Sequence, residues 1–310
     1  MPPPAQGLVV QVIATRPHQH CPLEHELGQT RRSASGEVFM CVPAGFQPGG
    51  TYAQCGSVLH LLRDSGGAWQ SERVTGSLHV CSFDTLPGGG IVTGCRGGAV
   101  LSWHRGSNGG WTPKELFYGG PGDLVRWRDR DSFVTGGLWG GGLSCWELIG
   151  GSWRREKITS DQPSGSALLP LPDGSVAVGE SGEVAGVSVW ARSGAHQRWE
   201  KTCSIALPRS GPPKGLELGA HGVIVCHDGS TIYALQRTGE KWTVHEVYGD
   251  LTPFDSLSLS PDGSVVVTGS YRVPVPGLRS HPDTWQLWPW VKVLRPSTTP
   301  KGPLPLAGCP

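Results

Sequence analysis

The sequence predicts an all-β protein built as a single β-propeller of four-stranded antiparallel blades. A tryptophan recurs at gaps of 42, 42, 46 and 43 residues, and a period of this length is typical of a propeller blade. The tryptophans that carry the period are Trp69, Trp111, Trp153, Trp199 and Trp242. The 47 glycines and 27 prolines fall at the joints between short apolar runs, which favours turn-rich β structure over disorder.

The fullest unit spans residues 77–120. Within it we expect strands at Ser77–Phe83, Gly90–Thr93, Ala99–His104 and Trp111–Phe117, because apolar residues alternate there and Gly-rich turns separate the runs. Units with the same order of strands and turns follow at about 121–162, 163–209, 210–250 and 251–297. A less regular unit precedes at 28–76, with Val38–Val42 as its expected first strand. The Pro-rich stretch 298–310 is expected to be a tail.

The N-terminal region adds the runs Leu8–Ala14 and Cys21–Leu27, which resemble the last two strands of a blade. This pair either completes the last blade, which would remove an open sheet edge, or forms half of a further blade. We expect seven blades, with six as the alternative. Residues 1–297 then form one propeller domain.

Two units contain nearly the same short sequence, at Leu169–Val176 and at Leu257–Val265, in which a Pro-Asp-Gly turn leads into an aliphatic strand. The predicted third strands Ala99–Trp103, Leu143–Trp146 and Val187–Trp190 each end in tryptophan. In these features the chain resembles WD-repeat propeller proteins over roughly residues 27–295. The chain resembles a divergent member of this family or a look-alike propeller, because Asp never follows the tryptophan and the Gly-His pair is missing. The resemblance implies a scaffold that binds other proteins.

Composition limits the partners and the compartment. The formal charge is +1, from 26 basic and 25 acidic residues, so no electrostatic footprint for nucleic acid or for anionic lipid is expected. The nine cysteines include no Cys-x-x-Cys pair, and several lie in apolar strand runs, which favours a reducing compartment. No apolar run is long enough to span a membrane. We therefore expect a cytoplasmic monomer.

The recurring tryptophans have two interpretations. A large apolar residue at a fixed place in every blade normally packs between sheets. Stacked indoles also serve as sugar platforms, and in that case they would be partly exposed beside Arg or Glu. Packing is the interpretation that we favour.

Signatures of metal binding and of catalysis are missing from the sequence. His18, His20, Cys21 and His25 have residue types that suit zinc, but their spacing does not match a closed site, and no second cluster supplies further ligands. Nucleophile-elbow, metalloprotease and P-loop motifs do not occur. We expect no catalytic residue, no metal and no cofactor.

Loops on one rim of a propeller are the expected binding surface, because loops on a rigid scaffold carry function. Trp139 is the strongest candidate, since it lies outside the repeat frame in a glycine-rich turn. Trp, Tyr and Arg dominate binding hot spots. The candidate partner-binding residues are Trp139, Tyr271, Arg272, Arg96, Tyr118 and His227.

The function predicted from these observations is a non-catalytic platform that binds a protein or peptide on this rim and is not an enzyme. A carbohydrate-binding propeller is the alternative, and a propeller hydrolase with a site in the central channel is a third. The hydrolase would require acids or histidines that converge in the channel, which a structure tests directly.

Overall fold

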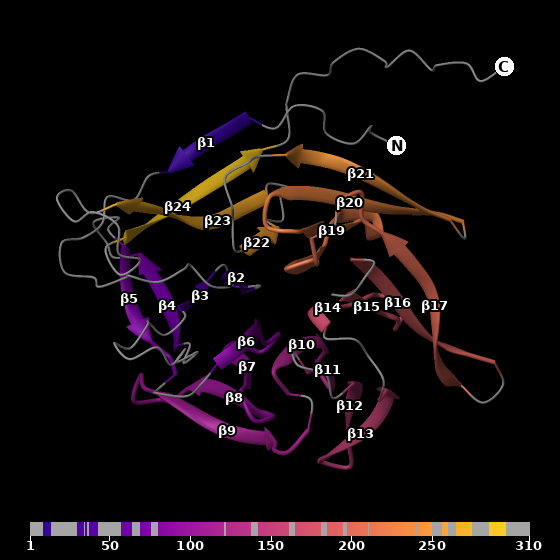
Figure 1. Ribbon diagram of the computed structural model, residues 1–310. Coiled ribbons are helices and arrows are strands. Elements are labelled where there is room, and N and C mark those ends of the chain that lie inside the picture. The colour runs from indigo at the N-terminus through magenta and orange to yellow at the C-terminus, as the bar shows by residue number, and fades with distance from the viewer. Residues whose placement is uncertain are drawn as a thin grey trace, which may run out of the picture.

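The computed structural model describes residues 9–13, 30–33, 35, 37–42, 57–63, 69–75, 80–120, 122–137, 142–160, 165–180, 185–194, 197–209, 211–239, 241–249, 256–259, 265–274 and 285–295. These residues form six four-stranded antiparallel sheets arranged around a common centre (Figure 1). The protein is therefore an all-β propeller, and the expected seventh blade is not found among the described residues.

In blades I to V the four strands follow one another in chain order from the innermost to the outermost. Blade I comprises β2 (Thr30–Arg32), β3 (Val38–Val42), β4 (Ser57–Arg63) and β5 (Trp69–Arg73). Blade II comprises β6 (Val80–Thr85), β7 (Ile91–Cys95), β8 (Ala99–Arg105) and β9 (Trp111–Phe117). Blade III comprises β10 (Leu124–Asp129), β11 (Ser132–Gly136), β12 (Leu143–Ile149) and β13 (Ser152–Thr159).

The second half of the ring repeats this order. Blade IV comprises β14 (Gly165–Pro170), β15 (Val176–Glu180), β16 (Gly186–Ser193) and β17 (Arg198–Ala206). Blade V comprises β18 (Gly215–Leu218), β19 (Ile224–His227), β20 (Thr231–Thr238) and β21 (Lys241–Gly249), with a short 3-10 turn at Ala220–Gly222. Blade VI comprises β22 (Ser256–Leu259), β23 (Val265–Pro274), β24 (Trp285–Arg295) and β1 (Val9–Ile13).

The ring is closed by the N-terminal strand. β1 pairs antiparallel with β24, with Val9 opposite Arg295 and Ile13 opposite Val291, and so becomes the outermost strand of blade VI (Figure 1). This pairing gives blade VI its fourth strand and joins the two ends of the chain in one sheet. Of the two roles considered for the N-terminal run Leu8–Ala14, completion of the last blade is correct. The run Cys21–Leu27 lies outside the described residues.

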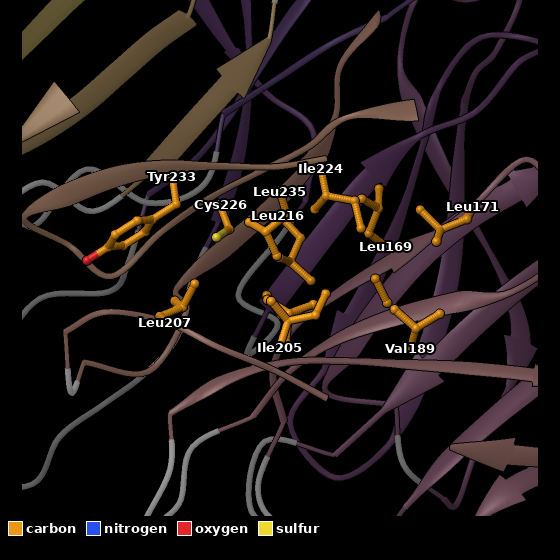
Figure 2. Packing of buried hydrophobic residues seen from close by; sticks show 13 residues of the cluster. Leu169, Leu171, Val189, Ile205, Leu207, Leu216, Ile224, Cys226, Tyr233 and Leu235 are labelled. Carbon is orange, nitrogen blue, oxygen red and sulfur yellow. The ribbon is translucent and has the colours of Figure 1, made fainter. Parts of the chain in front are cut away.

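Adjacent innermost strands contact one another all around the ring, from β2 through β6, β10, β14, β18 and β22 and back to β2. The apolar core lies in the layers between neighbouring blades. The layer between blades IV and V holds side chains from both, among them Leu169, Ile205, Leu216 and Tyr233 (Figure 2). Apolar area removed from water between blades stabilises the ring by about 25 cal/mol per Å².

The recurring tryptophans belong to these layers. Trp111, Trp153, Trp199 and Trp242 are half-buried, and each packs against a different core cluster. These contacts agree with the packing interpretation for the four positions. The sugar-platform interpretation stays a prediction, since the indoles are partly exposed and the Arg192 guanidinium lies 5.3 Å from the centroid of the Trp199 ring. The third-strand tryptophans are tied within their own blades. Trp103 donates a hydrogen bond of 3.1 Å to the Thr93 hydroxyl, and Trp146 donates one of 3.0 Å to the hydroxyl of Thr135.

Two predicted segments differ from the observed strands. In blade I the innermost strand is Thr30–Arg32 and not Val38–Val42, because the short polar run at 30–32 was too brief to show alternation. In blade VI, residues 270–274 continue strand β23 instead of forming a loop, since they pair with β24 as far as Pro274 opposite Trp285.

Candidate functional site

Four charged side chains from the innermost strands of four blades meet in the middle of the ring. They are Arg31 on β2, Asp84 on β6, Arg126 on β10 and Glu217 on β18, and we call them the axial tier. The last three occupy the same register position, because Asp84, Arg126 and Glu217 lie opposite Val92, Val134 and Val225 of the second strand. The repeat therefore brings them to one level of the channel.

Arg126 is the most firmly held member of the axial tier. Its Nε donates to the Leu168 carbonyl at 2.9 Å, and its Nη2 donates to the Leu216 carbonyl at 2.6 Å and to Glu217 Oε1 at 2.9 Å. These acceptors belong to blades IV and V, so one side chain of blade III links three blades. Burial alone would lower the pKa of Arg126, but Glu217 and Asp84 outweigh it and the pKa is raised.

Arg31 completes the ion pairs from blade I. Its Nη1 lies 2.5 Å from Glu217 Oε1, and its Nε lies 3.7 Å from Asp84 Oδ1. Burial and the neighbouring Arg126 lower the pKa of Arg31 to about 10, against the opposing effects of Glu217 and Asp84. Arg31 is thus still a cation at neutral pH. The axial tier has two positive and two negative charges, and buried charges are tolerated when they are paired in this way.

Asp84 is oriented by the backbone. Its Oδ1 accepts the Thr85 N–H at 3.0 Å and its Oδ2 accepts the Trp127 N–H at 2.9 Å. The two guanidinium groups approach the same Oδ1 at 3.7 Å from Arg31 and 3.6 Å from Arg126. These separations exceed a direct hydrogen bond, and a water or substrate oxygen can bridge groups at such distances. The side chains of Asp84 and Glu217 are 15% and 16% exposed, so the carboxylates are not sealed.

The rim residues predicted for partner binding are only partly brought together. Arg96 is exposed in the turn after β7, and Tyr118 is 69% exposed just after β9. Their two loops touch, since a Cβ on Gly98 would lie 2.2 Å from the Gly120 carbonyl oxygen. The binding role of Arg96 and Tyr118 stays a prediction.

The other predicted residues are placed differently. His227 is the last residue of β19 and is completely buried, so it offers no rim surface, and its assignment there was wrong. It lies over Gly215, where a Cβ would come within 2.8 Å of Nε2, because β18 and β19 are paired at this point. Tyr271 and Arg272 belong to strand β23, opposite Trp288 and Leu287, and not to a loop. Trp139 lies outside the described residues.

The axial tier was not among the residues that the sequence indicated. A charged residue inside an otherwise apolar innermost strand was the available signal, as in Val125-Arg126-Trp127 and Leu216-Glu217-Leu218. Residue-by-residue spacing cannot show which of these charges converge. Among the described residues, no group of three or more His, Cys, Asp or Glu side chains is arranged to hold a metal ion. In the same part of the chain, no helix is long and apolar enough to cross a membrane.

The fold defines the class of protein as a β-propeller, and comparison with known proteins extends this. No family model and no curated protein matches the chain. Solved structures do match over nearly the whole chain. A streptogramin B lyase has a TM-score of 0.57 and 14% identity, with coverage of 93% of this chain and 98% of the lyase.

Two further matches are enzymes by their titles. A gluconolactonase from Xanthomonas campestris has a TM-score of 0.57 and 11% identity, with coverage of 94% of this chain and 98% of the other. A luciferin-regenerating enzyme has a TM-score of 0.58 and 12% identity, with coverage of 93% and 95%. At such identities the likeness establishes the fold.

These matches correct the predicted function. The solved propellers that match this chain include a gluconolactonase and a lyase by their titles, which contradicts the expectations of a non-catalytic platform and of a protein that is not an enzyme. The specific resemblance to WD-repeat proteins is not supported beyond the propeller itself. The third predicted function, a propeller hydrolase, required acids or histidines that converge in the central channel. The carboxylates of Asp84 and Glu217 meet the two arginines there.

Proposed function

We propose that this chain is an enzyme of the hydrolase or lyase class and that the axial tier is its reaction centre. One observation carries the proposal: the Asp84 carboxylate converges with the guanidinium groups of Arg31 and Arg126 at the axis of the ring. The lyase and lactonase titles of similar propellers support the same class of chemistry. A shared fold does not by itself establish a shared function, so the assignment of a reaction centre is drawn from the side chains of the axial tier.

In this proposal the arginines stabilise negative charge that develops on a substrate carbonyl oxygen. Guanidinium groups are permanent cations with several N–H donors, and fixed donors in a water-poor site act strongly on such charge. Arg126 is held by two backbone carbonyls and Glu217, so we assign it to positioning as well. Arg31 reaches both carboxylates from blade I, which suits it to meet a substrate oxygen.

Asp84 would serve as the base. In a hydrolase it accepts a proton from water, the water oxygen bonds to the carbonyl carbon, the C–O bond of the ester breaks, and the proton passes to the departing oxygen. In a lyase it accepts a proton from the carbon adjacent to the one that bears the ester oxygen. A C=C bond forms between these two carbons, and the C–O bond breaks so that its electron pair leaves on the oxygen as a carboxylate. An ionised carboxylate keeps free lone pairs after accepting the two backbone N–H bonds, so Asp84 retains the capacity to accept a proton.

The test is an activity assay on a sugar δ-lactone, an aliphatic lactone and a cyclic ester peptide. Mass spectrometry separates the two reactions, because a hydrolysed product gains the mass of one water and a lyase product does not. We expect Asp84→Asn to lower kcat/KM by about 100-fold, as loss of a general base does. The matched control is Asp129→Asn, an exposed carboxylate at the end of β10.

Two results of this assay would contradict the proposed function. Wild-type protein that turns over none of the three substrates would contradict the proposal, and so would full activity in Asp84→Asn. Thermal unfolding of each variant separates loss of chemistry from loss of fold. Asn keeps an oxygen that can accept one backbone N–H, so the variant is expected to fold.

A further inference from the structure

A second charged cluster lies away from the axis, at the joint between blades I and II. His60 on β4 is completely buried, and each of its ring nitrogens faces a carboxylate. Its Nε2 lies 3.4 Å from Glu37 Oε1, and its Nδ1 lies 3.8 Å from Glu72 Oε2. The ring itself is stacked on Phe39 of blade I at 4.6 Å and meets the edge of Trp111 of blade II at 5.7 Å.

The surrounding polar groups hold both carboxylates in place. Glu72 Oε2 also accepts a hydrogen bond from Arg105 of blade II at 3.2 Å. Glu37 Oε2 accepts from the Ser35 hydroxyl at 2.8 Å and from the Ser33 hydroxyl at 3.4 Å. One oxygen of each carboxylate is thus held by a neighbouring side chain, and the separations of 3.4 Å and 3.8 Å from the imidazole nitrogens exceed an ordinary hydrogen-bond length.

The protonation state of His60 determines how many of its ring nitrogens can donate a hydrogen bond toward the two carboxylates. A neutral imidazole has one donor and one acceptor, so one of its nitrogens must face a carboxylate oxygen without a proton between them. An imidazolium would have two donors, but it would place a charge in an apolar stack with no solvent contact. Among the described residues, the titratable or charged groups that face the ring are Glu37 before β3, Glu72 on β5 and Arg105 on β8. The residues packed on it from β3 and β9 are apolar.

We propose that His60 is an acid-sensitive joint, at which uptake of one proton loosens the packing between blades I and II. Burial lowers the pKa of His60, opposed by Glu37 and Glu72 and assisted by Arg105. A lowered pKa in the folded state means that the proton binds better when the imidazole is released. Protonation therefore favours separation of His60 from the Phe39 and Trp111 rings. Trp111 of blade II contacts both His60 and Phe39 of blade I, so these edge contacts join the two blades here.

The effect of His60 protonation on the opening of the joint is confined to a defined pH range. Above the ordinary histidine pKa of about 6.5 the imidazole is neutral in both states and the joint is closed. As the pH falls below this value, the opening equilibrium rises by at most about tenfold per pH unit, until the folded-state pKa is reached. This device is independent of the proposed enzymatic activity.

Hydrogen exchange measured by mass spectrometry at pH 7.0 and 5.5 tests the proposal, with rates corrected for the intrinsic effect of pH. Because His227 lowers the stability of the whole fold on acidification, we expect protection of β4, β5 and β9 to fall by more than that of β17 in blade IV. His60→Gln should abolish this additional fall. The matched control is His227→Gln, because His227 is equally buried but lies in blade V, and this variant should keep the effect in blades I and II.

Two results would contradict the proposal that His60 is an acid-sensitive joint. One is an equal loss of protection in His60→Gln, and the other is unchanged protection in the wild type. Should His60→Gln fail to fold, NMR titration of wild-type His60 decides the question, because a pKa at or above that of a free histidine contradicts the proposal.

Discussion

Arg126 of blade III donates a hydrogen bond of 2.9 Å to Glu217 of blade V, 91 residues further along the chain. The contact passes over blade IV, whose Leu168 carbonyl accepts from the same guanidinium. Adjacent blades of a propeller are joined mainly by apolar layers, which act only between neighbours. A charge pair across the axis couples two blades that are not neighbours in the ring, and it can do so because the innermost strands converge.

This coupling predicts a large penalty when one partner is lost. Arg126→Met leaves Glu217 buried with a single guanidinium and frees two carbonyls, so we expect a loss of about 3–5 kcal/mol in the free energy of unfolding. Urea unfolding measures it. The control is Arg209→Met, which removes an exposed pair with Glu246 at 3.3 Å and should cost under about 1 kcal/mol. Equal penalties in the two variants would mean that the axial tier contributes no more than a surface pair.

The buried His227 predicts a fall in stability with acid. Burial, Lys214 and Arg31 lower the pKa of His227 to about 3, although Asp228 opposes them. The unfolded chain therefore binds a proton near the ordinary value of about 6.5 while the folded chain does not. Stability is unaffected above this pH and falls by about 1.4 kcal/mol per pH unit below it, until the folded pKa is reached.

Unfolding midpoints between pH 7.5 and 4.5 test this expectation. His227→Gln should reduce the slope, since glutamine carries no titrating group. The exposed His104 provides the control, and His104→Gln should leave the slope as in the wild type. An unchanged slope in His227→Gln would show that this histidine does not set the acid limit of the fold.

Two neighbouring glycines separate backbone strain from close packing. Gly97 and Gly98 have φ angles of +87° and +82°, which favour glycine in both cases. A Cβ on Gly97 meets open space, whereas one on Gly98 would lie 2.2 Å from the Gly120 carbonyl oxygen. We expect Gly97→Ala to cost about 1–2 kcal/mol and Gly98→Ala clearly more, because the loop 118–120 must move. Thermal unfolding compares the two, and similar costs would contradict the close approach.

The indole of Trp146 is the clearest case of a paired buried polar group. Trp146→Phe keeps most of the packing against Phe133 and Phe117 but leaves the buried Thr135 hydroxyl without its donor. We expect a loss of about 1–3 kcal/mol. The double variant Trp146→Phe/Thr135→Val removes both partners and should be more stable than Trp146→Phe alone. A double variant that is less stable would assign the effect to packing instead of the hydrogen bond.

The sequence alone predicted the architecture because the repeat is local information. The tryptophan period, the Pro-Asp-Gly turns and the alternating runs each depend on a few neighbouring residues, and together they specify a strand or a hairpin. Positions such as Trp111–Phe117 and Ala99–Arg105 were recovered nearly to the residue. The packing role of the tryptophans follows from the same regularity.

The number of blades and the candidate site were decided only by the tertiary structure. Both depend on closure of the ring, which brings β1 beside β24 and carries Arg31, Asp84, Arg126 and Glu217 to one level of the axis. These residues are separated by one to several blade lengths, and each resembles any other charged residue near a strand end. A ring fixes contacts between positions by geometry and not by spacing along the chain, so no local pattern distinguishes the charges that meet from those that face solvent.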